Sequence, residues 1–88
     1  MPSMTLTDAK KLAKPLREAL EGDIDGQRLI DSLVEMAHRE HHLTGTEAHA
    51  LEEKQLDAAA LALAHRLNAP EIQPAAIEFF DAVRLSLT

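Results

Sequence analysis

The strongest helix signal in this chain is the stretch LDAAALALAHRL, which occupies residues 56–67. Seven consecutive positions, 58–64, hold only Ala and Leu, two of the best helix formers. The residues that recur at the spacing of one helix face are Leu56, Ala59, Ala60, Leu63 and Leu67. Because the run is apolar on every side, it predicts a central, buried helix from about residue 44 to residue 67.

A second amphipathic segment precedes this helix. Its wide apolar face consists of Leu29, Ile30, Leu33, Val34, Met36 and Ala37. Asp25 has the position of a helix N-cap, and Ile24 and Leu29 have the spacing of a hydrophobic staple. We therefore expect a helix from Asp25 to about His42. Thr44 followed by Glu47 matches a capping box for the helix that comes next.

The first helix is expected from about residue 7 to residue 21. Thr5 and Asp8 have the spacing of a capping box before it, and apolar residues then recur at intervals of three and four. Pro15 lies inside the segment. Proline has no amide hydrogen and its ring crowds the preceding turn, so the sequence predicts a first helix kinked at Pro15, with a bend or break near Lys14.

The fourth helix is expected after Pro70 and Pro74, because a proline in the first turn of a helix costs nothing. It carries both aromatic residues of the chain, the neighbours Phe79 and Phe80, whose directions differ by about 100° on a helix. Its apolar stripe is wide for so short a helix. We therefore expect an interface on this helix, formed by Phe79, Phe80, Val83 and Leu87.

These segments together predict an all-α fold. No stretch of five residues alternates between apolar and polar as a half-buried strand would. We expect a small four-helix bundle in a single helical domain over residues 1–88, with flexible residues 1–6 and a central third helix. The expected core consists of Leu16, Leu20, Leu29, Ile30, Leu33, Ala37, Leu56, Ala59, Ala60, Leu63, Leu67, Ile77, Phe80 and Val83.

The composition excludes several classes of protein. The chain has 88 residues, of which 45% are hydrophobic, and it has no Cys. Disulfides, thiolate metal sites and a Cys nucleophile are therefore excluded. The longest apolar run has seven residues and the first twenty residues do not resemble a secretory signal, so we expect no membrane association and a cytoplasmic location.

The charge of the chain is negative and uneven. The net charge is −6; residues 1–22 hold four Lys/Arg against three Asp/Glu, and residues 23–88 hold five against twelve. An acidic surface repels nucleic-acid phosphates, so direct nucleic-acid binding is not expected. The acidic body favours a basic protein partner. The alternative is that it only keeps a small protein soluble.

A cluster of His and Glu residues is the best candidate for a metal site. Glu35, His38 and His42 share one face near the end of the second helix, with the Glu-x-x-His spacing that helical bundles use for metals. His49 and Glu52 give the reverse order on the next helix. In an antiparallel hairpin His42 would lie near His49 and His38 near Glu52 or Glu53, so that four N/O ligands could converge on Zn, Fe, Mn or Ni. The alternative is a solvated helix end, where the helix dipole favours positive charge.

The triplet Asp31-Ser32-Leu33 resembles that of acyl carrier proteins, in which the Ser carries a phosphopantetheine arm at the start of a helix. The resemblance covers three residues, and the glycine expected before the triplet is missing. The apolar pattern also places Ser32 about two turns inside the second helix. An ordinary helical Ser is therefore the competing interpretation.

The remaining patterns favour a protein without catalytic activity. The sequence contains no recognisable Ser/His/Asp arrangement, phosphate-binding Gly loop or paired-carboxylate cleft. We expect a small protein-interaction or regulatory module, such as an adaptor, an inhibitor or an antitoxin-like regulator, that forms a homodimer and needs no cofactor. The alternatives are a metal-binding helical protein of the di-iron or zinc type and an acyl-carrier-like domain modified on Ser32.

Overall fold

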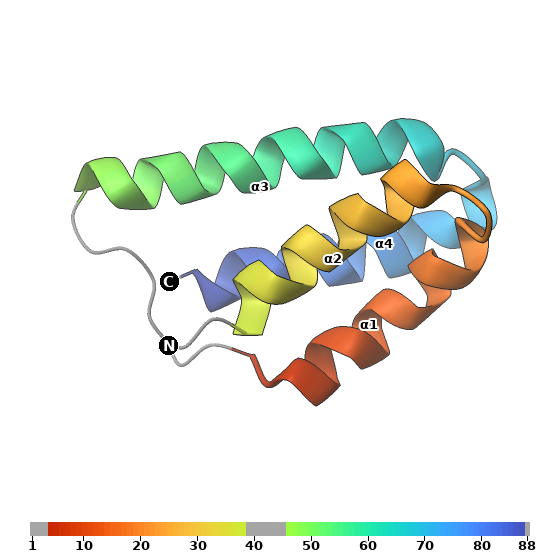
Figure 1. Cartoon of the computed structure of the whole chain (residues 1–88), viewed down its shortest axis with the longest axis horizontal. Coiled ribbons are helices and arrows are strands. Elements are labelled where there is room, and N and C mark those ends of the chain that lie inside the picture. The colour runs from red at the N-terminus through yellow and green to blue at the C-terminus, as the bar shows by residue number, and fades with distance from the viewer. Residues whose placement is uncertain (1–3, 39–45, 88) are drawn as a thin grey trace.

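The computed structural model describes residues 4–38 and 46–87, with side chains described for 4–38 and 50–87. In that part of the chain the helices are α1 (Leu6–Ala19), α2 (Ile24–His38), α3 (Thr46–Arg66), the short 3₁₀ helix η1 (Pro70–Ile72) and α4 (Gln73–Ser86) (Figure 1). The described residues form no strand. The predicted all-α fold with four helices is therefore confirmed.

The centre of the bundle is formed by α2 and α4. α1 packs against both, and α3 packs against both without contacting α1. Figure 1 accordingly shows α3 along one edge of the molecule and α1 along the opposite edge. This corrects the prediction of a central third helix. Ala58 and Ala64 are exposed and Leu61 is 63% exposed. Exposing an alanine methyl costs little, because its apolar area is small.

The core is built from apolar side chains of all four helices. The largest apolar side chains that are fully buried are those of Leu16, Ile30, Leu33, Leu56, Leu63, Phe79 and Val83. Of the expected core residues, Ile77 is 57% exposed, and four are only partly buried: Leu29, Ala59, Ala60 and Phe80. The buried row of α4 runs through Ala76, Phe79 and Val83. Phe80 is rotated by about 100° from Phe79 and therefore flanks this row.

Side-chain caps close the first turns of α1 and α2. Thr5 Oγ1 accepts a hydrogen bond from Asp8 N at 3.2 Å, which confirms the expected cap of α1. At α2 the cap is Asp23, whose Oδ1 accepts a hydrogen bond from Gly26 N at 2.9 Å. The prediction that Asp25 is the cap is wrong, because Asp25 lies inside the first turn of the helix.

The early start of α2 depends on the turn before it. Gly22 has a φ of +88°, in the left-handed region that favours glycine, and Asp23 N donates to Leu20 O at 2.9 Å. The chain therefore reverses direction within a few residues. Ile24 is left 68% exposed, so the expected staple between Ile24 and Leu29 is not supported.

Helix α1 is continuous through Pro15 from Leu6 to Ala19, so the expected break near Lys14 is absent. Pro15 lacks the N–H group that would bond the carbonyl of Lys11, and both residues are exposed. Water can therefore satisfy this carbonyl and the helix tolerates the proline. A bend of the helix axis at this position stays a prediction.

Polar contacts connect the end of α3 to both α4 and α2. Gln73 Nε2 donates to Leu67 O at 2.7 Å, and Pro74 lies in the first turn of α4 as expected. Arg66 donates to the two carboxylate oxygens of Asp23 at 2.8 and 2.7 Å. This ion pair connects the end of α3 to the start of α2.

Candidate functional site

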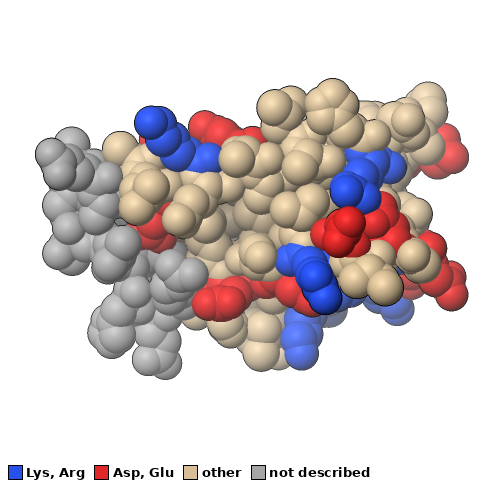
Figure 2. All heavy atoms as spheres, turned by 45° about the horizontal axis from the view of Figure 1, so that its top comes forward, with Lys and Arg blue, Asp and Glu red and all other residues tan. Residues whose placement is uncertain are grey.

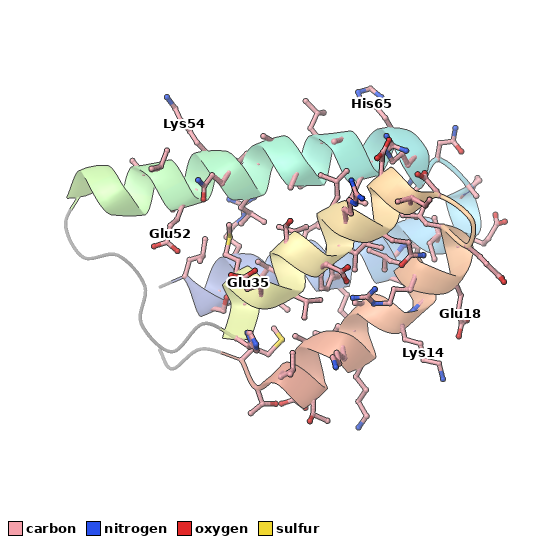
Figure 3. The ribbon with its side chains drawn as sticks, in the orientation of Figure 1. Lys14, Glu18, Glu35, Glu52, Lys54 and His65 are labelled. Atoms are coloured by element: carbon pink, nitrogen blue, oxygen red, sulfur yellow. The ribbon has the colours of Figure 1, made fainter. Side chains whose placement is uncertain are left out.

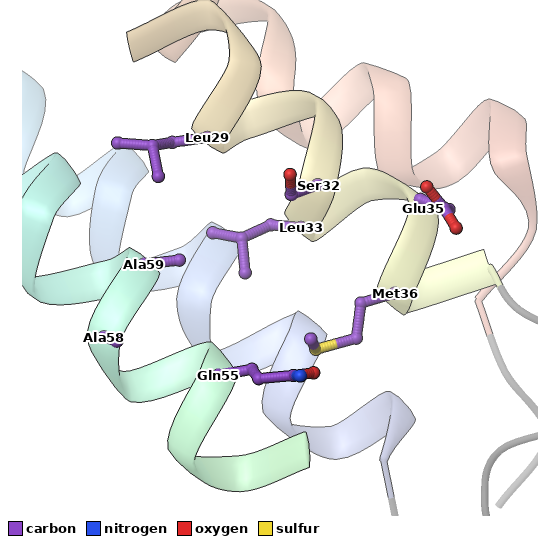
Figure 4. Close-up of a pocket in the computed structure, with 8 residues that line it drawn as sticks. All are labelled: Leu29, Ser32, Leu33, Glu35, Met36, Gln55, Ala58 and Ala59. Carbon is purple, nitrogen blue, oxygen red and sulfur yellow. The ribbon is translucent and has the colours of Figure 1, made fainter. Parts of the chain in front are cut away.

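A groove of about 500 Å³ lies between α2 and α3 (Figure 4). It is lined by Leu29, Ser32, Leu33, Glu35 and Met36 of α2 and by Gln55, Ala58 and Ala59 of α3. A smaller hollow of about 350 Å³ lies beside the turn from α3 to α4, next to Arg66. Since the Arg66 guanidinium already binds Asp23, we take the groove between α2 and α3 as the candidate site.

The groove exists because small residues of α3 lie opposite large residues of α2. Figure 4 shows Leu33 directed toward Ala59, and Met36 directed toward Gln55. Leu33 and Met36 are buried and Leu29 is half-buried, so these side chains form an apolar floor. An alanine methyl fills much less volume than a leucine side chain, and space therefore remains between the helices.

The polar groups of the groove lie mainly on its α2 edge. Ser32 Oγ donates to Arg28 O at 3.0 Å, one turn earlier on the same helix. Glu35 is exposed at the other end of this edge. Among the described residues the Arg28 guanidinium has no ionic partner, whereas the neighbouring Asp31 is paired with Arg17. The α2 edge thus carries a positive charge at one end and a negative charge at the other.

Three of the five expected metal ligands have described side chains. Glu35 and His38 lie in the last turns of α2, and His38 Nδ1 is 3.1 Å from the carbonyl oxygen of Glu35. Glu52 is 1% exposed and lies on the side of α3 that faces α2 (Figure 3). No group of three His, Cys, Asp or Glu side chains within residues 4–38 and 50–87 is arranged to hold a metal. His42 and the His49 side chain lie outside the described residues, so the metal hypothesis stays a prediction.

Ser32 is the ninth residue of α2, which begins at Ile24. Its hydroxyl is exposed and is bonded to the Arg28 carbonyl of its own helix. This position differs from the helix start that the resemblance to acyl carrier proteins implies. Ser32 therefore enters the candidate site as a polar group on the edge of the groove.

The stripe on α4 that was expected to form an interface faces inward. Phe79 and Val83 are fully buried and Leu87 is 7% exposed, so these side chains already pack within the chain. Phe80 is half-buried, with its ring centroid 6.0 Å from that of Phe79. The large apolar residues that α4 does expose are Ile77 and Leu85.

The described surface carries both signs of charge. Figure 2 shows a face on which acidic and basic side chains surround a broad area without either. Arg84 and Asp57 form an ion pair at 2.9 Å between α4 and α3. Exposed pairs of this kind contribute little to stability.

Among residues 4–38 and 46–87, no helix combines the length and the apolar composition that a bilayer crossing requires.

The pKa of Asp23 lies below its ordinary value of 3.8, first because Gly26 N donates to the carboxylate and second because Arg66 does. A carboxyl group with a lowered folded-state pKa stabilises the fold above its ordinary pKa. This contribution is lost as the pH falls through the lowered pKa.

We therefore expect Asp23→Asn to have a lower urea midpoint than the native chain at about pH 6 and to lose this difference progressively as the pH falls below 3.8. Asn keeps an oxygen for the cap but has no charge for Arg66. The measurement is urea unfolding followed by circular dichroism. Asp25→Asn is the matched control, since Asp25 does not cap the helix, and the difference between its midpoint and the native one should change little with pH. A constant difference for Asp23→Asn would contradict the assignment.

Comparison of the chain with protein-family models, with curated proteins and with solved structures finds no match. The candidate site therefore rests on its own geometry.

Sequence reasoning assigned Leu29, Leu33 and Ala59 to the core and missed the groove. The available signal was the pair of small residues Ala58 and Ala59, which in this fold lie opposite the long side chains of α2.

Proposed function

We propose that this protein is a small non-catalytic interaction module that binds a helical segment of a partner protein in the groove between α2 and α3. The observation that carries the proposal is the apolar floor of this groove, open to solvent and edged by a few polar groups. Amphipathic helices bind such grooves through apolar side chains on one face, while polar groups at the edges fix their position.

The dimensions of the groove suit a helix of about two turns. Leu29 and Met36 mark its two ends on α2 and are seven residues apart, which corresponds to about 10 Å along a helix. Side chains at positions i, i+3 or i+4 and i+7 of a partner helix span the same length. Two or three large apolar side chains of the partner would therefore occupy the groove.

The charge of the chain supports a basic partner. The net charge is −6, and the excess of acidic residues lies within residues 23–88, which include both helices of the groove. Such a surface attracts a segment rich in Lys and Arg and raises its rate of association.

The homodimer expected from the sequence is a separate proposal. Leu51 and Leu61, which are 50% and 63% exposed on α3, are apolar surface that a second copy would cover.

The function is tested by selecting peptides from a displayed library of amphipathic helices of about 16 residues, with varied apolar side chains at i, i+4 and i+7. Selected peptides are expected to bind the native chain. Ala58→Phe should weaken them at least about tenfold, because the ring would fill the groove. The measurement is fluorescence anisotropy of the labelled peptides.

The matched control is Ala64→Phe, which adds the same ring to another exposed alanine of α3 that does not line the groove. This variant should bind the peptides as the native chain does. Circular dichroism of both variants confirms that each is folded. If no peptide is selected, or if Ala58→Phe binds the selected peptides unchanged, the groove is not the binding site.

A further inference from the structure

The α2 edge of the groove carries opposite charges at its two ends. Arg28 precedes the first lining residue, Leu29, and Glu35 lies beside the last one, Met36. Arg28, Ser32 and Glu35 follow one another at intervals of four and three residues and therefore share one face of α2. The two charged residues are separated by about 10 Å along the helix, the same length as the groove.

The residues that line the opposite edge of the groove are uncharged. The α3 residues that line it are Gln55, Ala58 and Ala59, all of them neutral. Lys54 points away from α2, on the outer side of α3 (Figure 3). Glu52, one turn before Gln55 on the side of α3 that faces α2, is a further acidic residue toward the Met36 end and acts in the same direction as Glu35. On the α2 edge, the difference in charge between the two ends comes from Arg28 and Glu35.

Arg28 and Glu35 differ in their contacts within the chain. The Arg28 guanidinium has no ionic partner among the described residues, and the nearby carboxylate of Asp31 is paired with Arg17. Glu35 lies near the C-terminal end of α2, where the helix dipole adds to its negative potential. A carboxylate accepts several hydrogen bonds, so Glu35 can receive a cation from a ligand in addition to its contacts within the chain.

We propose that these two charges fix the direction of the bound helix, a refinement that rests on the proposed function. An acidic side chain of the partner meets Arg28, and a Lys or Arg about seven residues away meets Glu35. Helices with acidic residues in the first turn and basic residues in the last are favoured by their own dipole. A segment of that kind therefore lies parallel to α2.

The direction can be measured with a synthetic peptide of about 14 residues that has Glu in its first turn, Leu at i, i+4 and i+7, and Lys in its last turn. A nitroxide label at the peptide N-terminus weakens the amide NMR signals of nearby residues. In the native chain the loss of signal is expected around Leu29. In the doubly substituted chain Arg28→Glu/Glu35→Arg the loss of signal is expected around Met36, because the peptide binds in the opposite direction.

Lys54→Glu is the control, because it changes a charge on the outer side of α3 and not beside the groove. In this variant the loss of signal should still occur around Leu29. Arg28 and Glu35 are both exposed, and thermal unfolding of the variant checks that it is folded. If the loss of signal stays around Leu29 in the doubly substituted chain, or is equal at both ends in the native chain, the charges do not set the direction. In either case the groove still binds the peptide and the proposed function stands. If the peptide causes no signal loss at either end, the proposed function itself fails.

Discussion

Replacing Phe79 by Ala is expected to lower the free energy of unfolding by about 3–5 kcal/mol. The Phe79 side chain is fully buried in the row of α4 that contacts the rest of the core. Removing the ring loses its transfer free energy and leaves a cavity that the surrounding helices fill only in part. A chain of this size has a total stability of roughly 4–13 kcal/mol, so the variant loses a large part of it.

The control is Phe80→Ala, which removes the same ring from the next residue. Phe80 is only partly buried, so the loss is expected to be clearly smaller, about 1–2 kcal/mol. Urea unfolding of both variants gives the two values. If Phe79→Ala is unfolded without urea, Phe79→Leu gives a smaller loss that can still be measured. A larger loss for Phe80→Ala would mean that α4 is rotated from the orientation described above.

The order and approximate positions of the helices could be predicted from the sequence because their signals are local. The expected end of the second helix at about His42 lies outside the described residues. The apolar spacing, the prolines at 70 and 74 and the cap formed by Thr5 and Asp8 act within one or two turns of the chain. The N-cap of α2 was missed because Asp23 and Asp25 are both acceptable capping residues. The choice depends on the turn at Gly22 and on Arg66, which is distant in the sequence.

The packing of the helices could not be predicted because it depends on pairs of helices. Phe79 and Phe80 are equivalent in the sequence, and only the orientation of α4 against α1 and α2 distinguishes them. The groove likewise belongs to neither α2 nor α3 alone. Ala59 fits a core and the wall of a groove equally well, since its methyl group tolerates either environment.

The position of α3 at the edge of the bundle leads to the second large effect. Leu63 is fully buried, whereas Leu61, two residues earlier on the same helix, is 63% exposed. Leu63→Ala is therefore expected to lower the free energy of unfolding by about 2–5 kcal/mol, and Leu61→Ala by less than about 0.5 kcal/mol. Urea unfolding at a low protein concentration measures both. Equal losses would show that α3 is buried on all sides, as the sequence alone suggested.

The same pair of variants distinguishes a monomer from the proposed homodimer. If a second copy covers the outer side of α3, the unfolding midpoint of the native chain rises with protein concentration, because association stabilises the folded state. Leu61→Ala should then abolish this rise while leaving the midpoint at low concentration unchanged. Sedimentation equilibrium of the native chain and of Leu61→Ala gives the oligomeric state directly. A native midpoint that does not depend on concentration, together with a monomeric mass, would leave α3 solvent-exposed and the groove beside it free for a partner helix.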